Sequence, residues 1–119
     1  MAYTNRGNAF GAKGEDDRVI MDHTKAIEIN PKFAKAYYNR GITYCIKSEY
    51  DQAILDFTKA IEIDPEGAIP FRGRGAAYAE LGKSEEAKKD LLKALELDPK
   101  LWESVKRISE HYELDLKLD

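Results

Sequence analysis

The sequence predicts an all-α solenoid of three antiparallel helix hairpins followed by a capping helix. Three observations predict this fold class. Motifs recur at a fixed spacing of 34 residues, apolar residues in each copy follow helical periodicity, and a proline closes each copy. A unit of this length holds one helix hairpin, which cannot bury its apolar face alone and therefore stacks on its neighbours.

The repeat is visible in residues of several types. The 34-residue spacing relates Gly7, Gly41 and Gly75; Ala26, Ala60 and Ala94; and Pro31, Pro65 and Pro99. The segments KAIEINP, KAIEIDP and KALELDP align on it as well. Aromatic residues precede each glycine by four positions (Tyr3, Tyr37, Phe71) and follow it by three (Phe10, Tyr44, Tyr78). We expect repeats at 2–34, 35–68 and 69–102, a capping helix at 103–114 and a tail at 115–119.

Each repeat is expected to contain two helices. In the second copy Tyr37, Gly41 and Tyr44 fall on one face of a helix. A glycine on such a face lets two helix backbones approach closely. The residue before proline is pushed out of the helical region, which ends the second helix of each copy. Ser48, three residues before Asp51, indicates a capping box. The expected helices span 3–13, 17–29, 35–47, 51–63, 69–81 and 85–97.

The two ends of the array are expected to differ from its centre. Gly11 and Gly14 add to Gly7 near the N-terminus, and each glycine in a helix interior costs about 1 kcal/mol, so the first helix is expected to be the least stable. After Pro99 a fourth copy begins and stops, with Ser109 where the glycine should be. This pattern predicts a capping helix over the last apolar face, with fraying beyond about residue 114.

The composition excludes several classes of protein. A chain of 119 residues with 43% hydrophobic and 34% charged residues is neither disordered by composition nor a membrane protein. The single cysteine, Cys45, forbids an internal disulfide, which together with the lack of a signal peptide predicts a cytoplasmic location. A net charge of −3 disfavours non-specific nucleic-acid binding. Two histidines and one cysteine, far apart, disfavour a zinc site, and we expect no cofactor.

The order of residue types within each unit resembles the tetratricopeptide repeat: aromatic, glycine, aromatic, small residue, bulky residue, alanine, proline. The resemblance covers nearly the whole chain. It implies a right-handed superhelix in which the first helix of each pair lines a concave groove. It also implies a non-enzymatic protein-protein interaction module or scaffold, which binds a peptide segment or a partner helix in that groove.

The resemblance also implies which residues line the groove. These are Thr4, Asn5 and Asn8 in the first repeat, Tyr38, Asn39, Ile42, Cys45 and Ile46 in the second, and Arg72, Ala76 and Ala79 in the third. Asparagine side chains there can hydrogen-bond the backbone of an extended peptide, and the tyrosine offers a rigid anchor. The two isoleucines either contact a partner or pack against the neighbouring repeat, and the sequence leaves both interpretations open.

Some members of the family bind the acidic C-terminal tails of chaperones through a clamp of three cations and two asparagines. In this chain Asn8 and Asn39 match the two asparagines, but Thr4, Ile69 and Gly73 stand where the cations should be. A buried carboxylate would lose its charge-assisted hydrogen bonds without those cations. We therefore expect that this chain does not bind chaperone tails through that clamp.

Charged residues also recur at the repeat spacing. Arg6, Arg40 and Arg74 stand where the family most often has leucine, and Asp22, Asp56 and Asp90 repeat with them. The favoured interpretation is an ion pair inside each repeat, with the arginine stem packed over apolar surface. The alternative is a charged strip for a partner.

Two isolated histidines have two interpretations each, and the isolated cysteine has one. His23 replaces the bulky apolar residue found in the other copies. It is either a tolerated substitution, which is favoured because no second ligand stands at helical spacing, or a pH switch or ligand. His111, on the capping helix, has the same two interpretations. The thiol of Cys45 is expected to be inert, because no neighbour in sequence lowers its pKa.

Two further functions remain as alternatives. The chain can be a self-association module, a homo-oligomer that pairs through its first repeat or exchanges a terminal hairpin. It can also be the repeat part of a larger protein. An enzyme is disfavoured because no nucleophile elbow, phosphate loop or HExxH motif occurs.

Overall fold

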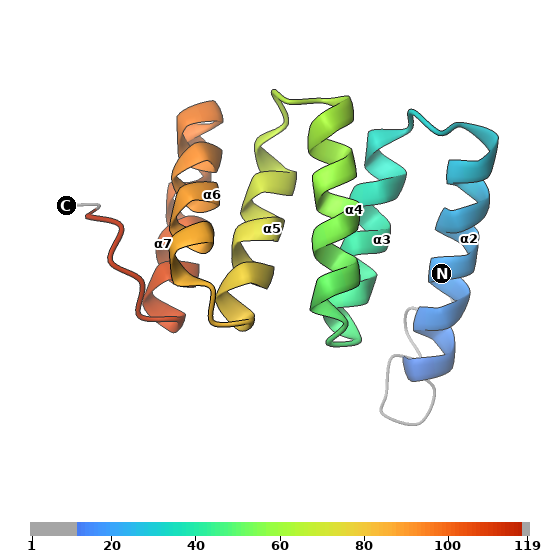
Figure 1. The fold of residues 1–119 in the computed structure, drawn as a ribbon, viewed down its shortest axis with the longest axis horizontal. Coiled ribbons are helices and arrows are strands. Elements are labelled where there is room, and N and C mark those ends of the chain that lie inside the picture. The colour runs from blue at the N-terminus through green and yellow to red at the C-terminus, as the bar shows by residue number, and fades with distance from the viewer. Residues whose placement is uncertain (1–11, 118–119) are drawn as a thin grey trace.

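The computed structural model describes residues 12–117, which form a row of antiparallel helices without strands (Figure 1). The elements are α2 (Ala12–Ile29), α3 (Ala34–Ile46), α4 (Tyr50–Ile63), α5 (Ala68–Glu80), α6 (Ser84–Leu97), the short 3₁₀-helix η1 (Pro99–Leu101) and α7 (Trp102–His111). The predicted all-α solenoid is confirmed. Most of the expected first helix, 3–13, lies outside the described residues, so its low stability stays a prediction.

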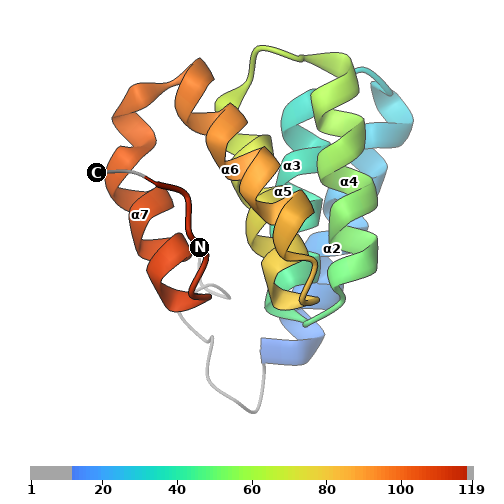
Figure 2. The ribbon, with the colours of Figure 1, turned by 60° about the vertical axis from the view of Figure 1, so that its left-hand side comes forward.

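The packing order shows which side of the row is concave. From α2 to α6, each helix packs mainly against the helices before and after it in the chain. In addition α3 contacts α5 directly, whereas α2, α4 and α6 make at most marginal contact with one another. Because the first helices of successive repeats come closer together than the second helices do, the row curves with α3 and α5 on its inner side. Figure 2 shows α7 at the end of this row.

The four central helices, α3 to α6, begin and end within one residue of their expected bounds. The N-terminal one does not. The sequence predicted a helix over 17–29, but α2 begins at Ala12 and continues through Gly14. No proline interrupts this stretch, and Glu15 in the first turn interacts favourably with the helix dipole. One glycine inside a helix costs only about 1 kcal/mol, which these features offset.

The turns between the helices of a pair have a common geometry. Ser48 and Gly82, 34 residues apart, both have left-handed backbones, with φ of 62° and 78°. In each turn the next residue's amide reaches back to close a Schellman motif, with Glu49 N 2.8 Å from the carbonyl of Tyr44. The expected capping box at Ser48 is therefore wrong: Glu49 is the N-cap residue of α4, and no side chain caps this helix.

The core of the second hairpin is one aromatic ring between two glycines. Phe57 on α4 is fully buried. A Cβ atom added to Gly41 on α3, or to Gly73 on α5, would lie 2.9 Å from a carbon of this ring. The third hairpin repeats the arrangement with Gly75 and Leu91, where the added Cβ would also lie 2.9 Å from a side-chain carbon. The expectation that the recurring glycines allow close helix approach is confirmed in both hairpins.

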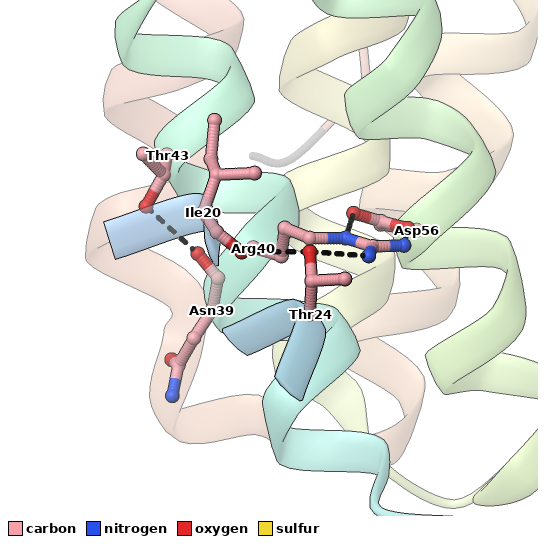
Figure 3. Close-up of polar contacts among 6 residues, drawn as sticks. All are labelled: Ile20, Thr24, Asn39, Arg40, Thr43 and Asp56. Carbon is pink, nitrogen blue, oxygen red and sulfur yellow. Dashed lines mark hydrogen bonds and ion pairs between the residues drawn. The ribbon is translucent and has the colours of Figure 1, made fainter. Parts of the chain in front are cut away.

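The expected ion pairs are confirmed in the second and third repeats. Arg40 Nε and Nη2 donate to the two carboxylate oxygens of Asp56 at 2.7 and 2.8 Å, and its Nη1 donates to Thr24 Oγ1 at 3.1 Å (Figure 3). This one guanidinium thus ties α3 to the following helix of its own repeat and to the preceding repeat. The hydrogen bond to Asp56 raises the pKa of Arg40 above its usual value.

The same polar network recurs one repeat later. Arg74 donates to Asp90 at 2.7 and 2.9 Å and to Thr58 Oγ1 at 3.1 Å. Both aspartates are buried, so these pairs fasten the helices rather than form a charged strip for a partner. Arg6, the third arginine of the series, lies outside the described residues.

The C-terminal segment differs from its expectation. The capping helix was expected to reach residue 114, but α7 ends at His111, and Glu113 makes a left-handed turn with φ of 56°. The expected fraying beyond residue 114 is wrong, because Leu114 and Leu116 are only 9% and 7% exposed and belong to a core cluster with Val105 of α7. The alternation Leu-Asp-Leu-Lys favours an extended chain with both leucines on one side.

Candidate functional site

The candidate site is the concave side of the row. Of its expected lining residues, Thr4, Asn5 and Asn8 lie outside the described residues. The other eight lie on α3 and α5, the two helices that approach each other on the inner side. Their burial and contacts decide which of them can reach a ligand.

The α3 residues differ in how much surface they offer. Ile46 is 65% exposed, although it is a large apolar side chain. Ile42 and Asn39 are partly buried, and the backbone carbonyl of Asn39 accepts a hydrogen bond from Thr43 Oγ1, which leaves its side-chain amide out of that contact (Figure 3). Tyr38 is also half-buried, with its ring 5.7 Å from that of Phe57. Packing against the core holds this tyrosine in place.

Cys45 is partly buried on α3. Burial, followed by the charge of Glu80, raises the pKa of its thiol to about 11. The thiolate is therefore a minor form at neutral pH, which agrees with the expected inertness of this cysteine.

The α5 residues of the expected groove have three different environments. Arg72 is half-buried, and its Nη1 donates to Ser104 Oγ of α7 at 2.9 Å. Ala76 is partly exposed and borders a hollow. Ala79 is 9% exposed and belongs to the same core cluster as Leu116, so it offers little surface to a ligand.

A hollow of about 500 Å³ lies between α5 and α7 at the end of the concave side. It is lined by Arg72, Ala76, Ser104, Arg107, Ile108, His111 and Tyr112. The five of these residues that follow residue 102 were not among the expected groove residues, because the repeat pattern predicts α7 only as a cap. The spacing of these residues could have indicated them, because positions 104, 107, 108, 111 and 112 lie on one face of a helix.

A larger hollow of about 780 Å³ lies on α5 and α6. Its aromatic residues are Phe71 and Tyr78, which flank the guanidinium of Arg74 at 5.6 and 5.9 Å from their ring centres. The rest of its lining includes both lysines and glutamates of α6. Because Arg74 is already paired with Asp90, its guanidinium is not available for a ligand.

The histidines do not form a metal site in the described part of the chain. Between residues 12 and 117 no group of three or more histidine, cysteine or acidic side chains is placed to hold a metal ion. His23 on α2 is half-buried, and burial is the main reason that its pKa is lowered. No helix within the same residues is long and apolar enough to cross a membrane.

Helix pairs stacked in a curved row, with the first helices inside, define the class of helical repeat solenoids. The tetratricopeptide repeat family model matches residues 34–66 and 68–101, together more than half of the chain. The chain therefore belongs to the tetratricopeptide repeat family, which places it among the protein-interaction modules. No match is found among curated protein sequences.

Solved structures with the same fold include domains that bind peptides. The chain is 30% identical to the Arabidopsis OM64 TPR domain, with a TM-score of 0.77 over 91% of this chain and 88% of that one. It is 34% identical to the second TPR domain of human RPAP3 in complex with the HSP70 peptide SGPTIEEVD, with a TM-score of 0.75 over 90% and 89% of the two chains. The first TPR of Spaghetti (RPAP3), bound to the HSP90 peptide SRMEEVD, is 29% identical, with a TM-score of 0.74 over 90% and 87%.

Proposed function

We propose that this chain is a non-enzymatic protein-interaction module, which binds a peptide segment or a partner helix on the concave side formed by α3, α5 and α7. The observation that carries the proposal is the surface of α3 and α5. On these helices an apolar side chain, Ile46, is 65% exposed, and a cation, Arg72, is only partly buried. Neither of these side chains is fully buried in the core. Related domains that bind chaperone peptides support a peptide as the ligand.

The groove proposed here contains the α3 residues Tyr38, Asn39, Ile42, Cys45 and Ile46, with Arg72 and Ala76 of α5, and extends over α7. We include Thr4, Asn5 and Asn8 in the groove only because the resemblance to the tetratricopeptide repeat implies them. The clamp for a free C-terminal carboxylate is not part of it. Gly73, at one of the cation positions of that clamp, packs against Phe57, so a cationic side chain has no room there.

A matched pair of variants tests the proposal. Ile46 on α3 and Leu55 on α4 are both 65% exposed, but α3 lies on the inner side and α4 on the outer side of the row. Ile46→Lys and Leu55→Lys therefore each add one positive charge and remove a similar apolar area, but on opposite faces of the row. Peptides selected from a random displayed library against the wild-type chain are then measured against both variants by fluorescence anisotropy.

The proposal expects Ile46→Lys to weaken binding of the selected peptides by about tenfold or more, since a buried apolar contact of this size is worth about 1.5–3 kcal/mol. Leu55→Lys should leave the affinity within twofold. An equal loss of affinity in both variants, or a loss only in Leu55→Lys, would contradict a binding site on the concave side. Light scattering on the same samples shows whether the bound species is instead a second copy of the chain.

A further inference from the structure

The arginines of helices α3 to α7 fall into two pairs with different environments. Arg40 and Arg74 each donate three hydrogen bonds, two of them to an aspartate. Arg72 and Arg107 make no ion pair within 4.0 Å among the described residues. Both line the hollow between α5 and α7. The hollow thus gathers the two arginines of helices α3 to α7 that form no ion pair with the described residues.

A hydrogen bond orients the guanidinium of Arg72 but does not engage all of its N–H donors. One of its five N–H donors is engaged by Ser104 Oγ at 2.9 Å, and that hydroxyl donates in turn to the carbonyl of Leu101 at 3.0 Å. This chain of bonds fixes one edge of the guanidinium against α7. Its remaining donors have no protein acceptor in the described part of the chain, so a ligand oxygen can take them.

A small residue leaves room for such a ligand. Ala76 borders the hollow, and the equivalent position one repeat earlier holds the larger Ile42. The inner surface therefore changes along the row. It is apolar at Ile42 and Ile46 of α3, and it is hollowed and cationic at Arg72 and Arg107.

The acidic residues nearby do not cancel this charge. Among the described residues, no carboxylate lines the hollow itself. Glu80 stands at its edge and accepts the hydroxyl hydrogen of Tyr112. Arg107 also borders a smaller hollow on α7 with Glu103 and Glu110, but neither of these carboxylates lies within 4.0 Å of its guanidinium. His111, on the same face of α7, is exposed.

We propose that the hollow formed by Arg72, Ser104, Ala76 and Arg107 binds the side-chain carboxylates of an acidic segment in the peptide partner, while the apolar part of the groove on α3 takes an apolar residue of the same peptide. This inference rests on the proposed function and names the chemistry of its partner. We do not expect the free C-terminal carboxylate to be the ligand, because Thr4, Ile69 and Gly73 stand where the three cations of the clamp should be.

The experiment compares peptides selected by three forms of the full chain. Seven-residue random peptides are displayed and selected against the wild type, against Arg72→Gln/Arg107→Gln, and against Lys89→Gln/Lys93→Gln. The last variant removes two charges from α6, outside the hollow, and is the matched control. We expect glutamate and aspartate to be enriched in the peptides selected by the wild type and by the control. Arg72→Gln/Arg107→Gln should still select peptides, but without acidic enrichment.

Synthetic peptides then measure the effect. For a selected acidic peptide, exchange of its glutamates for glutamine should weaken wild-type binding by about tenfold, the effect of one lost charge-assisted hydrogen bond. The same exchange should change binding to Arg72→Gln/Arg107→Gln by less than twofold, and amidation of the C-terminus should have no effect. Circular dichroism confirms that the variants are folded, and the single variant Arg107→Gln, at an exposed position, repeats the test without disturbing Ser104.

The outcomes separate the two proposals. If the selected peptides bind Ile46→Lys more weakly than the wild type, the proposed groove is supported. If these peptides show no acidic preference, or if Arg72→Gln/Arg107→Gln selects the same acidic residues, the acidic-segment inference is wrong. A preference that disappears on C-terminal amidation also overturns the inference. If the wild type selects no peptide at all, the proposed function fails and the inference fails with it.

Discussion

Arg40 and Asp56 form a two-bond ion pair, at 2.7 and 2.8 Å, that links the two helices of one repeat. The side chain of Asp56 is only 7% exposed. If Arg40 is replaced by leucine, this carboxylate remains buried without its cation. Removing one partner of a buried pair costs about 3–5 kcal/mol. Since the arginine side chain is itself 19% exposed, we expect Arg40→Leu to lower the free energy of unfolding by about 3 kcal/mol, measured by urea denaturation.

An exposed pair and a double variant serve as controls. Lys93→Ala breaks the surface pair between Lys93 and Glu96 and should change stability by less than about 0.5 kcal/mol. Arg40→Leu/Asp56→Ala removes both charges and should recover at least about 1 kcal/mol relative to the sum of the single changes. Additive single effects would mean that the two residues do not act as a pair.

The close approach of Gly41 to Phe57 gives a second prediction. Gly41→Ala places a Cβ atom 2.9 Å from the phenylalanine ring, and overpacking of this kind costs about 1–3 kcal/mol. Gly14→Ala is the control, because its Cβ atom meets nothing within 4 Å. There the better helix propensity of alanine should raise stability by up to about 1 kcal/mol. Thermal denaturation of both variants checks the opposite signs, and a stabilised Gly41→Ala would contradict the packing described here.

His23 gives the chain a pH dependence of predictable sign. Burial lowers its pKa below the ordinary value of 6.5. The unfolded chain therefore binds a proton before the folded chain does as the pH falls below 6.5. The stability contributed by the neutral histidine is complete above this pH and is lost as the pH falls through the lowered pKa. Urea denaturation at pH 7 and pH 5 should show a larger loss for the wild type than for His23→Gln, and equal losses would refute the prediction.

The C-terminal segment is expected to stabilise the last hairpin. Leu114 and Leu116 are buried in the cluster that contains Leu91. Leu114→Ala/Leu116→Ala should lower the free energy of unfolding by about 2 kcal/mol or more, since each leucine loses buried apolar area. Asp115→Ala, between them but exposed, should have little effect. Amide hydrogen exchange in α6 and α7 provides the local measurement, and unchanged protection in the double variant would argue against a packed segment.

The repeat pattern predicted the centre of the molecule well because periodic residues there also make periodic contacts. Gly41 packs on Phe57 as Gly75 does on Leu91, and Arg40 pairs as Arg74 does. Such contacts lie within one hairpin or between neighbouring hairpins, so the 34-residue spacing is enough to infer them.

The ends were predicted less well because their residues break the period. Gly14 corresponds to Ser48, which makes a left-handed turn, but the local sequence around Gly14 continues a helix instead. Leu114 and Leu116 have no counterpart in the repeat, so the period could not indicate their burial. The hollow between α5 and α7 depends on how the capping helix docks, which a repeat pattern does not encode.

We propose that a ligand binds on the concave side of α3, α5 and α7, and amide chemical-shift mapping is the decisive measurement. A selected peptide is titrated into the ¹⁵N-labelled chain. We expect the largest shifts at residues such as Ile42, Ile46, Arg72 and Ala76, with little change at Leu55 and Leu92 on the second helices. Shifts concentrated on α4 and α6, with α3 and α5 unaffected, would contradict the claim.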